Sequence, residues 1–176
     1  MKNRISTKKA ILCALFAALT AAFAQITIPI SIIPITLSLV PVYIAGAMLG
    51  PVYGGISILV YLLLGLCGLP VFQSFKGGAP VLLGPTGGYI VGFIFTAVIT
   101  GAIVKIKKDK FFIYPIAMVI GCAVCYAFGT AWFVIQSHTP ILSALSLCVV
   151  PFIPGDILKI AAASFISHRL NKIVKL

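Results

Sequence analysis

The chain has 176 residues, of which 61% are hydrophobic and 9% charged, and its mean hydropathy of +1.22 is too high for a soluble domain of this size. This composition indicates an integral membrane protein and excludes a soluble catalytic or nucleotide-binding module. The net charge of +11 reflects 13 Lys and Arg residues against two acidic residues. Because the basic residues lie at the ends of apolar runs, they indicate topology and attraction to the anionic lipid bilayer, and a nucleic-acid interface is not expected.

Apolar runs broken by Pro, Gly and charged residues predict an all-α fold with a single transmembrane domain over residues 1–176. About six spans fit if each needs ~20 residues. The predicted spans are 9–28, 36–50, 52–68, 85–104, 111–136 and 153–170. A further apolar piece at 140–150 is interpreted as either a short helix or a re-entrant segment.

Basic residues form three clusters, before the first predicted span, after the fourth and after the sixth. Their members are Lys2, Arg4, Lys8, Lys9, Lys105, Lys107, Lys108, Lys110, Arg169, Lys172 and Lys175. An even number of spans separates the clusters, so the positive-inside rule places all three clusters and both termini in the cytoplasm. Lys76, Asp156 and Lys159 then fall in the opposite, extracytoplasmic half, where an anionic or strongly polar group should meet them.

The first predicted span begins with basic residues and contains Ala22-Phe-Ala24, a combination that also resembles a cleavable signal peptide. The apolar run continues to Ile28, so a complete span is the simpler interpretation. Alanines recur at every fourth position and form a stripe that permits close helix packing. Its members are Ala10, Ala14, Ala18 and Ala22. The stripe is expected either to pack within the chain or to dock a separate membrane subunit.

The longest connection, Gly68-Leu-Pro-Val-Phe-Gln-Ser-Phe-Lys-Gly-Gly-Ala-Pro80, combines glycine hinges, aromatic residues and a few polar groups. It is interpreted either as a lid over a pocket or as a surface loop. The following Gly84-Pro-Thr-Gly-Gly-Tyr89 lacks the Lys-Ser/Thr ending of a phosphate loop. Gly84, Gly88 and Gly92 recur at four-residue spacing and form a strip expected to serve close helix packing, and Thr86 and Tyr89 are candidate pocket residues.

The five cysteines are expected to be small apolar residues within the spans. Cys122 and Cys125 have the spacing of a redox motif, but they lie in a predicted membrane helix and not at a strand-to-helix turn. His138 and His168 are isolated in the sequence, so a metal site is not expected.

Asp156 is the acidic residue that needs an explanation, because it lies inside a strongly apolar stretch with Lys159 one helical turn later. A charge at membrane depth costs roughly 2.5–3.5 kcal/mol on insertion scales, and such residues usually face a functional cavity. One interpretation is structural: Asp156 stabilises the first turn of the last helix and pairs with Lys159. The functional interpretation is that the pair binds a small polar ligand, since a neutral Ser or Asn would cap the helix at lower cost.

Four segments, in this order, resemble the BioY family: Gly68-Leu-Pro-Val-Phe72, Gly84-Pro-Thr-Gly-Gly-Tyr89, Gly129-Thr-Ala-Trp132 and Pro151-Phe-Ile-Pro-Gly-Asp-Ile-Leu-Lys159. This family comprises biotin-specific substrate-capture (S) components of energy-coupling factor (ECF) transporters. The resemblance implies six membrane helices, an outward-facing biotin pocket covered by loops, and a place in the bacterial cell membrane. It also implies a membrane coupling (T) subunit and two cytoplasmic ATPases as partners, with no cofactor and no enzymatic activity in this chain.

By this resemblance, Asp156 accepts hydrogen bonds from the ureido N–H groups of biotin, and Lys159 supplies positive charge near the polar end of the pocket or the carboxylate. The alanine stripe would dock the coupling subunit. The fourth predicted span and its loop contain no arginine to clamp the carboxylate, so Lys76, Lys159 or water would have to do so. Further candidate wall residues follow from residue type and predicted depth: Tyr43, Phe72, Gln73, Tyr89, Trp132 and Gln136.

Two other classes of function remain open from the residues. A stand-alone secondary transporter could use Asp156 to bind a proton or a carboxylate-bearing solute, although one acidic residue provides little coupling machinery. An intramembrane enzyme could be assembled from Ser74, Lys76 and Asp156, but no spacing among them requires it.

Overall fold

The computed structural model describes residues 7–28 and 34–174, which are mostly helical. The helices are α1 (Thr7–Ala24), α2 (Leu39–Leu66), α3 (Ala79–Leu83), α4 (Gly87–Ile106), α5 (Ile113–Ser137), α6 (Ile141–Cys148) and α7 (Ile153–Ile173). Short 3-10 turns occupy η1 (Gln73–Phe75) and η2 (Val150–Phe152). The strands β1 (Thr27–Ile28) and β2 (Ile35–Thr36) pair antiparallel between α1 and α2.

Five helical segments within the described ranges are long and apolar enough to cross a membrane, with Ile141–Ile173 counted as one. The predicted helical membrane class is therefore confirmed. The apolar piece at 140–150 forms the short helix α6, followed by η2. Of the predicted basic clusters, Lys2, Arg4 and Lys175 lie outside the described residues.

The predicted spans 36–50 and 52–68 are continuous in the structure, as the two arms of α2. The break between the arms is a kink at Gly50, whose φ of 78° and ψ of 179° are not helical. Pro51 follows and has no N–H to donate to the preceding turn. The first arm, residues 39–49, is buried throughout residues 41–49. At 1.5 Å per residue it covers about half of a ~30 Å hydrocarbon core, so it is an internal helix shorter than the predicted span.

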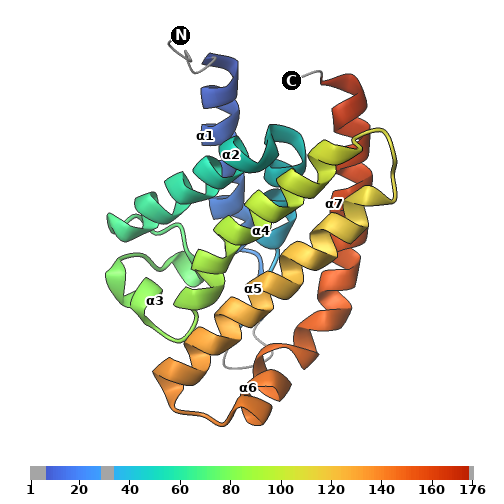
Figure 1. The fold of residues 1–176 in the computed structure, drawn as a ribbon. Coiled ribbons are helices and arrows are strands. Elements are labelled where there is room, and N and C mark those ends of the chain that lie inside the picture. Colours follow the sequence, from blue (N-terminus) through green and yellow to red (C-terminus); the bar gives the residue numbers. More distant parts are fainter. Residues whose placement is uncertain (1–6, 29–33, 175–176) are drawn as a thin grey trace.

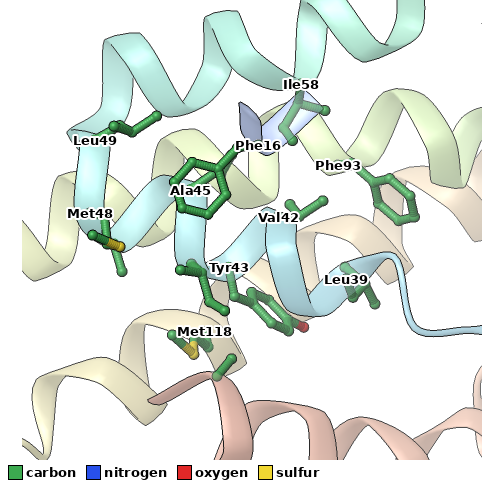
Figure 2. Packing of buried hydrophobic residues seen from close by; sticks show 14 of the residues in the cluster. Phe16, Leu39, Val42, Tyr43, Ala45, Met48, Leu49, Ile58, Phe93 and Met118 are labelled. Atoms are coloured by element: carbon green, nitrogen blue, oxygen red, sulfur yellow. The ribbon is translucent and has the colours of Figure 1, made fainter. Parts of the chain in front are cut away.

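The core forms where α2 packs against α1, α4 and α7, and where α4 packs against α5 (Figure 1). Figure 2 shows the buried cluster around the first arm of α2, where Val42, Tyr43 and Ala45 are fully buried. The α4–α5 contact uses the predicted glycine strip: Gly88 faces the Trp132 side chain, and a Cβ at Gly92 would lie 3.0 Å from the Cys125 sulfur.

Gly101 of α4 lies against the α2 kink, so Gly101→Ala should destabilise the fold. A Cβ there would lie 2.6 Å from the Gly50 carbonyl carbon, 2.6 Å from the Pro51 nitrogen and 2.7 Å from the Gly46 oxygen. Backbone atoms cannot move aside cheaply, and overpacking of this kind costs about 1–3 kcal/mol. Thermal unfolding in detergent would measure the loss. Gly155→Ala is the matched control, since its Cβ would meet only Ile35, at 3.9 Å, and it should unfold at or above the wild-type temperature.

The first turn of α1, the α4–α5 connection and the last turn of α7 lie at the same end of the molecule (Figure 1). α3 and α6 lie toward the opposite end. The described members of the three basic clusters therefore gather at one end, as expected for an even number of crossings between them.

Candidate functional site

Asp156 and Lys159 form a buried ion pair at the start of α7. Asp156 lies in the first turn of α7, after the η2 turn that contains Pro151, as the sequence predicts. The Lys159 Nζ lies 2.7 Å from the Asp156 Oδ1, and the two residues are 5% and 3% exposed. It is the only ion pair in the part of the chain that the structure describes. Its burial makes it costly to keep unless the geometry is good and the remaining polar atoms are satisfied.

Two residues of α5 contact the other oxygen of the carboxylate. The Tyr126 hydroxyl donates a hydrogen bond to Asp156 Oδ2, and the Cys122 thiol lies 3.7 Å from the same atom. An ionised carboxylate offers about four acceptor positions, so three donors leave capacity for a ligand N–H. The ammonium of Lys159 likewise has donors beyond the one used by Asp156. The pair is thus fixed in position while it retains hydrogen-bonding capacity.

A cavity reaches this ion pair from between α2, α4, α5 and α7. Five predicted site residues line it: Gln73, Thr86, Tyr89, Asp156 and Lys159. The remaining lining residues were not predicted and are Ala24, Pro34, Thr36, Ser38, Leu39, Tyr61, Ile90, Phe93, Cys125, Tyr126, Cys148 and Phe152. Apolar and aromatic walls with a few placed polar groups are typical of a small-molecule site.

The connection between α2 and α3 closes one side of this cavity. Phe72 is fully buried, with its ring 5.5 Å from that of Tyr61 and against Gly65, and Gln73 follows it into the cavity wall. Gln25, just after α1, forms two hydrogen bonds with the backbone of this connection. Its side-chain N–H donates to the Phe72 carbonyl at 3.0 Å, and its side-chain oxygen accepts from the Phe75 N–H at 2.8 Å. Of the two interpretations of this loop, a cover over a pocket fits these contacts.

Tyr89 lies in the first turn of α4 and lines the cavity. Its hydroxyl lies 2.9 Å from the Thr130 hydroxyl, and its ring packs against Gly129, where any side chain would collide with it. The Gly129-Thr130 pair on α5 therefore fixes the orientation of this aromatic wall.

Other predicted wall residues do not line the cavity. Tyr43 is buried in the core cluster, and its hydroxyl has no hydrogen-bond partner among the described residues. Trp132 packs over Gly88 and donates its indole N–H to the Gly84 carbonyl at 3.0 Å, so it joins α5 to the start of α4. Lys76 and Gln136 are exposed to the outside.

Tyr126 was missed by the sequence interpretation, although a signal was present. Cys122 and Tyr126 are four residues apart on α5 and therefore share a face of that helix. A hydroxyl within the apolar part of a membrane helix needs a partner. Asp156 was the obvious acceptor in the sequence.

Tyr126→Phe should weaken ligand binding by about tenfold, because a hydrogen bond to a charged group contributes about 1.5–3 kcal/mol and part of this orients the carboxylate. Equilibrium binding of labelled biotin, the ligand that the BioY resemblance implies, to the purified variant would measure the change. Tyr53→Phe removes a hydroxyl from a tyrosine away from this cavity and is the control. Unchanged affinity in Tyr126→Phe would show that the hydroxyl does not position Asp156.

The fold and site define a helical membrane protein with a ligand cavity built around one buried ion pair. The BioY family model matches residues 1–176, so the chain belongs to the BioY family. The "Biotin transporter BioY" of Thermotoga maritima is 42% identical over 132 residues, covering 74% of this chain and 76% of that protein. The "Probable biotin transporter BioY" of Pyrococcus horikoshii is 40% identical over 167 residues, covering 95% and 98%.

The fold is also similar to a solved structure. The crystal structure of the S-component for biotin from an ECF-type ABC transporter matches with a TM-score of 0.86 and 34% sequence identity. The match covers 98% of this chain and 95% of that chain. The similarity therefore extends over the whole arrangement of helices.

Proposed function

We propose that this chain is the high-affinity biotin-binding S component of an ECF-type uptake transporter. Its family membership and the printed names of its relatives support biotin as the ligand. The observation that carries the proposal is the buried Asp156–Lys159 pair, whose Oδ1 and Nζ atoms lie 2.7 Å apart. The pair lines an otherwise mostly apolar cavity.

Biotin matches the chemistry of this cavity. One of its ureido N–H groups is a donor for the remaining acceptor capacity of Asp156, and its thioether bicycle suits the apolar walls from Ile90, Phe93 and Phe152. The remaining donors of Lys159 are available for the ureido carbonyl or the carboxylate. Lys76 is exposed and outside the cavity lining, which leaves Lys159 or water as the nearer candidate for the carboxylate.

The outward face of α1 is the proposed docking surface for the coupling subunit. Ala10, Ala14, Ala18 and Ala22 are all exposed, while the opposite face buries Phe16 and Ala17. The stripe is therefore open to a helix of another subunit. Two cytoplasmic ATPases would supply the energy, so this chain would bind and deliver the vitamin without catalysing a reaction.

The proposed topology has six helices within the bacterial cell membrane, and the short internal first arm of α2 is counted as one of them. Both termini would be cytoplasmic, because the basic residues gather at the end of the molecule where α1 begins and α7 ends. The biotin cavity, near the start of α7, would then open to the extracytoplasmic side, and the vitamin would be released inward together with the coupling subunit.

Reconstitution in liposomes distinguishes this function from stand-alone secondary transport. Labelled biotin should accumulate only when the coupling subunit, both ATPases and ATP are present. Accumulation by this chain alone under a proton gradient would contradict the proposal and favour a secondary transporter that uses Asp156.

A further inference from the structure

A second cavity, of about 250 Å³, lies at the kink of α2, at the end of the molecule where the basic clusters gather. Its walls include residues 47–53 and Gly101 of α4. Three lysines also line it: Lys9 from α1, Lys105 from the last turn of α4 and Lys108 from the α4–α5 connection. Lysines from three separate segments thus converge on one hollow.

Within residues 7–28 and 34–174, no carboxylate forms an ion pair with these lysines. Asp156 and Asp109 are the only acidic residues in the chain, and neither lines this cavity. The single ion pair among the described residues is the one between Asp156 and Lys159. The Nζ of Lys9 lies 4.9 Å from the centroid of the Tyr53 ring, a cation–π contact that holds this ammonium at the cavity. Three like charges around one hollow repel each other, and a bound anion would relieve the repulsion.

The second arm of α2 adds to the positive potential. This arm begins at Pro51, after the non-helical Gly50, and both residues line the cavity together with Val52 and Tyr53. The first N–H groups of a helix lack carbonyl partners in the helix, and its dipole is positive at this end. The cavity therefore combines three ammonium groups with a helix start.

Its surroundings are those of a lipid site. Val52 on α2 lines the cavity and is 64% exposed. Ile11 on α1 is 63% exposed, and Ile56 on α2 is 40% exposed. Such residues face hydrocarbon, while the lysines lie at the end of the apolar helices, where headgroups are found. An anionic phospholipid presents a phosphate and acyl chains in this arrangement, whereas free phosphate would use only the charges.

We propose that this cavity binds the phosphate headgroup of an anionic phospholipid, whose acyl chains lie along α1 and the second arm of α2. The proposal is independent of the biotin site, which lies near the start of α7. Phosphatidylglycerol is a suitable probe, and phosphatidylcholine is its zwitterionic comparison.

Two triple variants test the proposal with equal loss of charge at the same end of the molecule. The cavity variant is Lys9→Gln/Lys105→Gln/Lys108→Gln. The control variant is Lys107→Gln/Lys110→Gln/Lys172→Gln, whose residues are exposed and do not line the cavity. Native mass spectrometry would count the phosphatidylglycerol molecules retained by each purified protein, and thermal unfolding in mixed micelles of detergent and phosphatidylcholine would check the fold.

Retention of phosphatidylglycerol should fall at least about tenfold in the cavity variant and stay near the wild-type level in the control variant, because only the lysines of the cavity variant converge on the position of the headgroup. Equal losses in both variants would overturn the proposal in favour of diffuse charge attraction. If inorganic phosphate stabilised the wild type as much as phosphatidylglycerol does, the acyl chains would contribute nothing, and the proposal of a lipid ligand would be overturned. Unchanged lipid retention in a cavity variant that no longer binds the coupling subunit would make the cavity a protein interface instead.

Discussion

Asp156→Asn should weaken biotin binding by about 100-fold or more. The amide nitrogen would present a donor where the ureido group also donates, and the charge that holds Lys159 would be lost. An unmatched buried polar group costs about 1–3 kcal/mol, and more when charge is involved, and every 1.4 kcal/mol is a factor of ten in affinity. Equilibrium binding of labelled biotin to the detergent-purified variant is the measurement.

Loss of folding must be separated from loss of binding in this experiment. Asp156→Asn leaves the Lys159 ammonium buried at 5% exposure without its carboxylate, and breaking a buried pair costs about 3–5 kcal/mol. The double variant Asp156→Asn/Lys159→Met removes that unpaired charge, so its unfolding temperature should recover toward the wild type. Biotin affinity should remain low in the double variant. A stable double variant with wild-type affinity would reject the ion pair as the binding group.

Ala14→Leu/Ala18→Leu should abolish stable association with the coupling subunit while biotin binding persists. Both alanines are exposed on α1, so the larger side chains fit in the isolated chain. At a close helix contact, however, two leucines would separate the backbones that small residues allow to approach. Co-purification with the tagged coupling subunit should fall by at least about tenfold, because overpacking an interface costs about 1–3 kcal/mol per position.

Ala127→Leu/Ala131→Leu is the matched control for the alanine stripe. These two alanines have the same four-residue spacing and are exposed on α5, away from α1. Their replacement should leave the coupling subunit bound. If both variants lose the partner equally, or if Ala14→Leu/Ala18→Leu retains it, α1 is not the specific docking surface.

The central ion pair could be predicted from the sequence because the physics is local. A carboxylate in an apolar stretch is costly, and Lys159 lies three residues away, where one helical turn brings it back to Asp156. The packing role of Gly88 and Gly92 was predictable because close helix contacts select glycine.

Contacts across helices were harder to predict, because every face of a membrane helix is apolar. Hydrophobic periodicity normally identifies the buried face, but it carries little information when lipid and core favour the same residues. Trp132 and Tyr126 both lie on α5, yet only Tyr126 faces the cavity. The hairpin that brings Thr36 and Ser38 to the cavity is a short pairing with almost no signal in the sequence.

The surroundings of the α2 kink were likewise not predictable from the sequence. Gly50-Pro51 marked a break between two segments, and the structure has one there. The sequence did not show that the first arm would be buried throughout residues 41–49, since this depends on how α1, α4 and α7 pack against α2.

Isothermal titration of biotin into the purified chain, without coupling subunit or ATPases, is the most direct measurement. A cavity organised by Asp156 and Lys159 predicts one biotin per chain with a Kd below about 1 μM, equivalent to roughly −8 kcal/mol. Absence of binding heat with a folded, monodisperse protein at several temperatures would contradict a biotin-binding S component.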